Sequence, residues 1–105
     1  MKTVMLYITA SNAKEAKKIG TVLVKERLAA CANVIDKIQS VYWWKDKIEK
    51  SAEALLIAKT KQRLAKRAIR RARALHSYEC PCIVALPIVD GNPSFLKWIS
   101  QETKK

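Results

Sequence analysis

The segment HSYECPC, residues 76–82, gathers side chains that are able to bind a metal. It contains His76, the only histidine of the chain, and two of the three cysteines, Cys80 and Cys82. Two thiolates and an imidazole suit soft or borderline metals such as copper(I) or zinc. The spacing C-x-C falls short of a four-ligand signature, however, and free cysteine is also among the most buried residue types. A metal site and a buried strand that contains sulfur are therefore both interpretations of this segment.

The third cysteine, Cys31, lies far from this segment, at the start of another strand-like run. Together with His76 it could form a thiolate–imidazole pair of the kind that activates a nucleophile. The sequence offers no clear third group for such a pair, and it contains no G-x-S-x-G, phosphate-binding loop or H-E-x-x-H motif. We therefore expect a protein that is not an enzyme.

Length and composition limit the kind of protein. The 105 residues indicate a single domain, 1–105, and half of them are apolar, without a run long enough to span a membrane. The N-terminal stretch is basic and then apolar but lacks a small-residue cleavage site, which favours a strand over a signal peptide. Three cysteines, an odd number, suit reduced thiols in a cytoplasmic protein.

The order of the predicted elements indicates the fold. Strands are predicted at 3–9, 31–44, 48–60 and 81–89, and helices at 11–29, 60–76 and after Pro93. Thr60 is expected to cap the second helix, and Pro87 favours an edge position for the last strand because proline cannot donate to a sheet ladder. The order β-α-β-β-α-β predicts an α+β, ferredoxin-like fold, in which one antiparallel sheet carries both main helices on one face.

The second and third strands are long for a domain of this size. Only KDK, 45–47, separates them, which predicts a hairpin with Asp46 in a left-handed turn conformation. A strand of about 13 residues spans on the order of 43 Å, and the tip carries Tyr42, Trp43 and Trp44. Aromatic residues on a projecting arm are more often an interface anchor than a ligand platform. We expect another copy of the chain to bury them.

The net charge of +12 is concentrated in the helix predicted at 60–76. No acidic residue occurs between Ala54 and Tyr78. Such a run could bind nucleic acid, but its basic residues lie opposite the apolar stripe, where a solvated helix carries charge in any case. The aromatic motif of RNA-recognition domains is also absent. We therefore expect a solvated face rather than a nucleic-acid partner.

Five stretches share their order and spacing with a known family: RLAACANV (27–34), SVYWWKDKIE (40–49), LLIAKT (55–60), HSYECP (76–81) and IVALPI (83–88). With the C-terminal NPSFLKWISQET, they resemble the CutA divalent-cation-tolerance family over essentially the whole chain. The resemblance implies a ferredoxin-like subunit in a homotrimer whose long hairpin strands pair between subunits. It also implies a role in tolerance to divalent metals, copper above all, with no established reaction.

The resemblance assigns roles to individual residues. Cys31 occupies the family's ACxN position and His76 opens its HPYExPE motif, so both are candidate copper ligands by resemblance. Glu79 matches the same motif as a further candidate ligand. Tyr78, which also matches, is expected to line an inter-subunit cleft, with Cys80 in support.

This sequence departs from the family pattern at three positions. Ser77 replaces the usual proline, Cys82 the usual glutamate, and Asp46 the usual hairpin glycine. If Cys82 faces the cleft, a soft sulfur replaces a hard oxygen donor and the preference for copper(I) increases, which makes Cys82 a candidate ligand. If it faces the core, the exchange affects only packing. The net charge of +12 should oppose cation binding at long range, although salt screens that effect.

A second hypothesis assigns the protein a different class of function. It is a trimeric signalling or scaffold module that binds a small molecule or a protein partner in its inter-subunit clefts, and it rests on fold-level analogy. A structural response to a small molecule without any response to metal would favour it.

Overall fold

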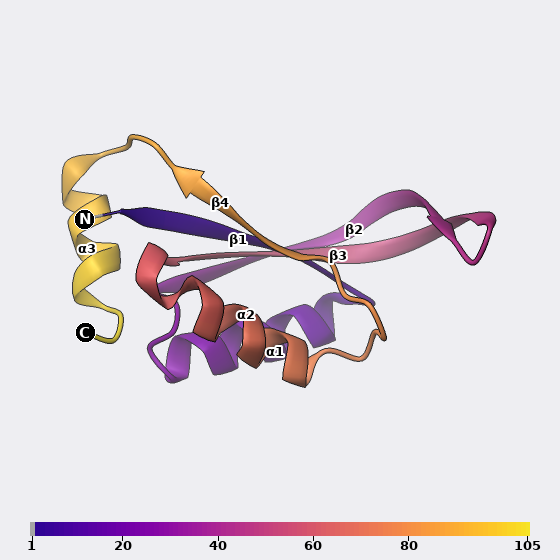
Figure 1. Ribbon diagram of the computed structural model, residues 1–105, viewed down its shortest axis with the longest axis horizontal. Coiled ribbons are helices and arrows are strands. Elements are labelled where there is room, and N and C mark those ends of the chain that lie inside the picture. Colours follow the sequence, from indigo (N-terminus) through magenta and orange to yellow (C-terminus); the bar gives the residue numbers. More distant parts are fainter. Residues whose placement is uncertain (1) are drawn as a thin grey trace.

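The computed structural model describes residues 2–105 and is built on one four-stranded antiparallel sheet, in the order β2-β3-β1-β4 (Figure 1). The elements are β1 (Thr3–Ala10), α1 (Ala13–Lys25), β2 (Cys31–Trp44), β3 (Lys47–Lys61), the short 3-10 helix η1 (Gln62–Leu64), α2 (Ala65–Leu75), β4 (Ile83–Ile88) and α3 (Pro93–Gln101). Helices α1 and α2 lie side by side on one face, and α3 lies across one end of the sheet. The predicted ferredoxin-like order is confirmed.

The hydrophobic core lies between the sheet and the two main helices. On β1 and on the part of β3 that pairs with it, the even-numbered residues face the helices, and Leu6, Ile8 and Leu56 among them are fully buried in the core with Ile19 and Leu23 of α1. Full burial of such a side chain contributes about 1.5–3 kcal/mol. One face of the sheet is thus closed by the chain itself.

Helix α1 approaches the sheet closely at Gly20. A Cβ atom at this position would lie 3.0 Å from Ala32 Cβ and 3.0 Å from Leu56 Cδ1. The absence of a side chain at Gly20 therefore sets the distance between helix and sheet.

The N-cap of the helix is Asn12, whose Oδ1 accepts a hydrogen bond from the Glu15 backbone nitrogen at 2.8 Å.

The opposite face of the sheet is open. It carries the alternate residues of the same strands, and on β4 these include Val84 and Leu86, which are 49% and 40% exposed. Strands β2 and β4 are the edges of the sheet. Pro87 lies in β4, so its predicted edge position is confirmed.

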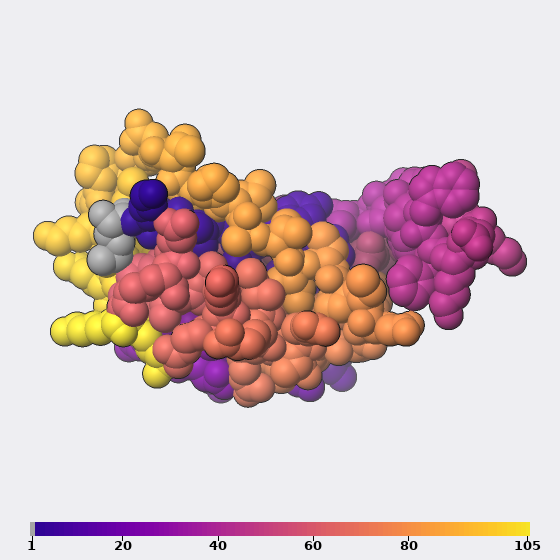
Figure 2. Space-filling view, in the orientation of Figure 1, coloured from indigo at the N-terminus to yellow at the C-terminus, as the bar shows by residue number. Residues whose placement is uncertain are grey.

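Beyond the core, β2 and β3 continue as a two-stranded arm, which protrudes from the body of the molecule (Figure 2). The arm gives the molecule its extents of 44 × 25 × 21 Å. Lys45 and Asp46 form the tip with φ of 50° and 66°, so the left-handed conformation predicted for Asp46 is confirmed. Trp43 is 72% exposed, and its burial by another copy stays a prediction.

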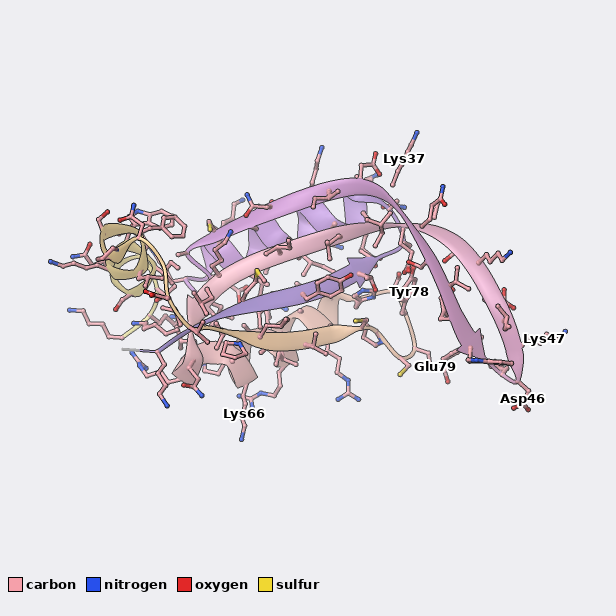
Figure 3. The ribbon with its side chains drawn as sticks, turned by 90° about the horizontal axis from the view of Figure 1, so that it is seen from above. Lys37, Asp46, Lys47, Lys66, Tyr78 and Glu79 are labelled. Carbon is pink, nitrogen blue, oxygen red and sulfur yellow. The ribbon has the colours of Figure 1, made fainter. Side chains whose placement is uncertain are left out.

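A β-bulge in β2 changes the pairing and the direction of the strand near the point where the arm leaves the rest of the sheet. Ile35 pairs with Leu55, but the next pair joins Ile38 to Glu53, so β2 has one extra residue, and Lys37 adopts a φ of 61°. After the bulge the even-numbered residues of β2 take the open-face side. A bulge bends its strand, and the two strands change direction near Lys37 (Figure 3).

Two local predictions were wrong. Thr60 does not cap a helix, because β3 continues through it to Lys61, where pairing with Thr3 of β1 ends, and η1 precedes α2. Cys80 and Cys82 do not lie on a strand, because β4 begins only at Ile83. In both cases pairing with β1, rather than local sequence, determines the boundary of the strand, which is the end of β3 and the beginning of β4.

The outer surface of α2 is basic. Lys66, Arg67, Arg70 and Arg73 are exposed, and Lys66 points away from the sheet (Figure 3). Arg71 instead donates to both carboxylate oxygens of Glu26 at 2.9–3.1 Å and so joins α2 to α1. The absence of a nucleic-acid partner stays a prediction. Among the described helices, none is long and apolar enough to cross a membrane.

Candidate functional site

The loop between α2 and β4, residues 76–82, is fixed at its start by His76. The ring nitrogen Nδ1 accepts a hydrogen bond from the Tyr78 backbone N–H at 3.1 Å. The proton of the neutral ring therefore lies on Nε2, which donates to the Thr9 carbonyl at 2.7 Å. Both nitrogens are engaged, so a metal at either one would have to displace a hydrogen bond.

Glu15 fixes the next residue of the loop. Its Oε2 accepts from the Ser77 N–H at 2.8 Å, and its Oε1 accepts from the Ser11 N–H and hydroxyl, both at 2.9 Å. Burial opposes ionisation, but the hydrogen bonds from Ser77 and Ser11 outweigh it and lower the pKa of Glu15 to about 2. The first turn of α1 thus holds the loop through a charged carboxylate.

Tyr78 connects the loop to the base of the arm. Its hydroxyl donates to Glu53 Oε2 at 2.7 Å, and Glu53 on β3 is only 6% exposed. Burial, and then the hydrogen bond to the Glu53 carboxylate, raise the pKa of Tyr78 above its usual range. The His76 and Tyr78 rings also lie in contact, with centroids 4.8 Å apart. The first three residues of the loop are therefore anchors.

The rest of the loop faces a cleft of about 820 Å³ beneath the curved arm. The cleft is lined by Tyr7 and Thr9 of β1, residues 39–44 of β2, Glu53 of β3, and Tyr78, Glu79, Cys80 and Cys82 of the loop. The concave side of the arm faces Tyr78 and Glu79 (Figure 3). The structure thus joins two sets of predicted residues, the arm aromatics Tyr42, Trp43 and Trp44 and the loop donors.

Cys31 lies elsewhere. It begins β2 on the open face, partly buried, with Lys59 Nζ 3.9 Å from its Sγ, and the same ammonium donates to Asn33 Oδ1 at 2.7 Å. In the sheet, Cys31 is two strands away from Thr9 and is offset from it by four residues along the strand direction. Thr9 is the residue that His76 contacts. The separation between Cys31 and Thr9 is roughly 16 Å, so one chain does not bring Cys31 and His76 together.

The donors within one chain do not form a complete metal centre. Among residues 2–105, no group of three or more His, Cys, Asp and Glu side chains is placed to hold a metal ion. All three cysteines are free, and Cys80 and Cys82 are exposed. Any metal held by a single chain would therefore have to accept fewer than three of these ligands.

Sequence reasoning missed two residues that build the site. Glu53 carries a signal, because it is a lone charge within the apolar run of β3. Glu15 lies in the helix predicted at 11–29, and nothing in the sequence pairs it with Ser77, 62 residues away.

The family model described as CutA1 divalent ion tolerance protein matches residues 4–102. The chain belongs to this family. The chloroplastic protein CutA 1 of Oryza sativa subsp. japonica is 37% identical over 103 residues, covering 98% of this chain and 58% of the rice protein. The divalent-cation tolerance protein CutA of Archaeoglobus fulgidus is 41% identical over 96 residues, covering 91% of this chain and 93% of that protein. The crystal structure of CutA1 from Oryza sativa matches with a TM-score of 0.96 at 36% identity, over 100% of this chain and 96% of that one.

Membership of the CutA1 family confirms the resemblance that the sequence motifs indicated. The description of the family and the name of the Archaeoglobus fulgidus relative describe divalent-cation tolerance and no reaction. This chain spans little more than half the length of the rice relative. The rice protein is chloroplastic and the Archaeoglobus fulgidus structure is described as periplasmic, so a cytoplasmic location stays a prediction.

Proposed function

We propose that this protein confers tolerance to divalent cations, copper among them, as a homotrimer that binds the metal without catalysing a reaction. The observation that carries the proposal is the cleft, where the candidate donors of the loop lie against an aromatic arm. In one chain this cleft is open, and it adjoins the exposed apolar face of the sheet. A second subunit would cover both.

The open face supports assembly. Val84 and Leu86 on β4 and Ile35 on β2 expose apolar surface on the two edge strands, and the arm adds Trp43 near its tip. Strands β2 and β4 are sheet edges with backbone groups available for pairing, and natural proteins normally cover or pair such edges. The trimeric count itself comes from the resemblance to the family.

The metal site proposed from the family motif joins Cys31 and His76, with Glu79 and Cys82 in support. Because Cys31 and His76 lie far apart within one chain, a metal that they share has to lie between subunits. Cys31 is on the face that a partner would cover. His76 contributes only if it gives up its hydrogen bond with Thr9 or Tyr78, so Cys31 is the stronger candidate ligand.

The test combines a mass measurement with a titration. We expect light scattering to give three times the chain mass, and a zinc(II) titration against a chelator under reducing conditions to give about one ion per subunit. Cys31→Ser should weaken binding about tenfold or more, which corresponds to about 1.4 kcal/mol. A monomer that binds no zinc or copper would contradict the proposal, and an unchanged affinity in both Cys31→Ser and His76→Ala would exclude the inter-subunit site.

The signalling or scaffold module is kept as a second candidate because of the size and lining of the cleft. Its volume of about 820 Å³ lies in the range of small-molecule sites, and the Tyr42 and Trp44 side chains line it. Thermal stabilisation by a nucleotide or other metabolite in the presence of a metal chelator would favour this function. The absence of stabilisation across a metabolite library would argue against it.

A further inference from the structure

We propose that Cys80 and Cys82 together form a two-thiolate site for copper(I), separate from the Cys31–His76 pair. This inference rests on the proposed function in that it names a particular ion and particular ligands for cation tolerance. It differs from the family motif, because one of the two thiols occupies the position of the motif's last glutamate.

The backbone presents both thiols to the same cleft. Thr9 N–H donates to the Cys82 carbonyl at 3.2 Å, which continues the β1–β4 ladder one step beyond the pair Ile8–Ile83. Cys82 therefore lies on the same open face of the sheet as Val84. It faces the cleft and not the core. Cys80 lines the same cleft and is likewise exposed.

Pro81 restricts the backbone between the two thiols. Its ring fixes φ near −65° and confines the preceding residue, Cys80, to extended conformations. In extended backbone, residues two apart project to the same side. Cys80 ends the bends of residues 77–80 and Cys82 follows beyond Pro81, so both thiols border the same cleft, and the loop is held by the His76, Ser77 and Tyr78 hydrogen bonds.

The number of donors selects the ion. Zinc takes four ligands in structural sites, and calcium and magnesium take six or more oxygens. Within residues 2–105 no set of three such side chains is arranged for a metal. Copper(I) is a soft d10 ion that is stable with two sulfur ligands, and thiolates are the donors that select it. A pair of thiols in an otherwise incomplete site therefore favours copper(I) over the divalent ions.

Charge balance also favours this ion. Copper(I) replaces the two thiol protons and forms two Cu–S bonds, so the product S–Cu–S carries a net charge of −1 and two protons leave to solvent. The chain has a net charge of +12, and its field favours an anionic product while it opposes the approach of a divalent cation to neutral ligands. The high charge, which argues against cation binding in general, is thus compatible with a dithiolate.

The other candidate donors are less suited to copper(I). Both ring nitrogens of His76 are hydrogen-bonded, and Cys31 lies at the far end of the open face beside Lys59. Cys31→Ser therefore reports on the separate Cys31–His76 pair, and a control has to lie outside both sites, as the exposed Arg67 on the outer surface of α2 does.

The experiment is an anaerobic copper(I) titration of the full chain against a copper(I)-specific chelator. Wild type is compared with Cys80→Ser and Cys82→Ser, with Cys31→Ser for the separate pair, and with the control Arg67→Ser. We expect about one copper(I) per subunit in wild type and control, with affinities within about twofold, and a loss of about a hundredfold or more in each cleft variant. Circular dichroism and light scattering check that each replacement leaves the fold and the assembly intact.

Proton release provides a second readout. Because copper(I) replaces the two thiol protons, its binding in weakly buffered solution should release two protons per ion in wild type and Arg67→Ser. A charge-transfer band in the near ultraviolet should appear with the same stoichiometry. Release of no proton, or a band that persists in Cys80→Ser, would overturn the assignment.

The outcomes separate this inference from the function on which it rests. If Cys31→Ser loses copper(I) while the cleft variants keep it, the dithiolate assignment is wrong and cation binding stands. If wild type binds copper(I) with unchanged affinity in all three cysteine variants, none of the thiols is a ligand and the dithiolate is again excluded. If wild type binds neither copper(I) nor zinc(II), both the inference and the proposed function fail.

Discussion

The two faces of the sheet are made from alternate residues of the same strands, yet they differ in what covers them. On the helix-covered face, Leu6, Ile8 and Leu56 are fully buried, whereas Val84 and Leu86 on the other face retain much of their exposure. Both faces are apolar, and strands that are apolar on both sides are typical of sheets covered on both sides. The chain therefore contains enough sequence to close one face, and the composition of the second face supports the proposal that a partner covers it.

The strongest test of this difference is a pair of matched truncations. Leu56→Ala should lower the free energy of unfolding by about 2–5 kcal/mol at any protein concentration, because it leaves a cavity in the core. Leu86→Ala should act mainly through association, so its effect should depend on protein concentration. Chemical denaturation at two concentrations measures both. Equal and concentration-independent losses would show that the two faces do not differ in this way.

A charge on the open face should separate subunits. Leu86→Glu places a carboxylate on the surface that we propose to be shared, and we expect the association constant to fall by about thirtyfold or more, since interface hot spots contribute about 2 kcal/mol or more. Sedimentation velocity measures the change. Arg67→Glu on the outer surface of α2 is the control and should leave the mass unchanged. An intact oligomer in Leu86→Glu would move the interface elsewhere.

Glu15 joins the helix layer to the loop that borders the cleft, and its contribution should depend on pH. Its folded pKa of about 2 lies below the ordinary value, so its contribution is complete above the unfolded pKa and is lost as pH falls from about 4.5 toward 2. Glu15→Gln should cost about 1–2 kcal/mol at pH 7. Urea denaturation from pH 7 to pH 3 should show the two proteins converging. A difference that does not change with pH would exclude the charged carboxylate as the cause.

The smallest effect should come from Thr60, on the covered face. Its hydroxyl is buried, and within the described chain Thr60 Oγ1 has no hydrogen-bond partner. Thr60→Val removes this unsatisfied group at constant shape, so we expect no loss of stability and a gain of up to about 1 kcal/mol. Thr103→Val is a suitable comparison because the Thr103 hydroxyl donates to the Ile99 carbonyl at 3.0 Å. A larger loss in Thr60→Val than in Thr103→Val would contradict this explanation.

Sequence patterns predicted the elements whose causes are local. The strand-like runs, the left-handed propensity of Asp46 and the proline of β4 each act within a few residues, and the structure agrees with them. Strand ends were predicted less well, because Thr60 and Cys82 lie where pairing with β1 decides the boundary.

The sequence predicted which residues belong to the site but not how those residues are arranged in space. The motif identified Tyr78, Glu79 and Cys82, and all three line the cleft. It did not show that both His76 nitrogens would be engaged by the backbone, or that Cys31 would lie across the sheet, because these depend on contacts between distant segments.

The bulge in β2 has a consequence for the shape of the cleft. Over the length that it shares with β3, β2 contains one residue more than its partner. Deletion of Lys37 would equalise the two strands and leave Tyr42 opposite Glu49 and Trp44 opposite Lys47, so each aromatic would keep its side of the ribbon. The bend would be lost, however, because the extra residue is its cause. The wall of the cleft would then straighten away from the loop although every residue that lines it was unchanged, which makes curvature, as much as chemistry, the property that encloses this site.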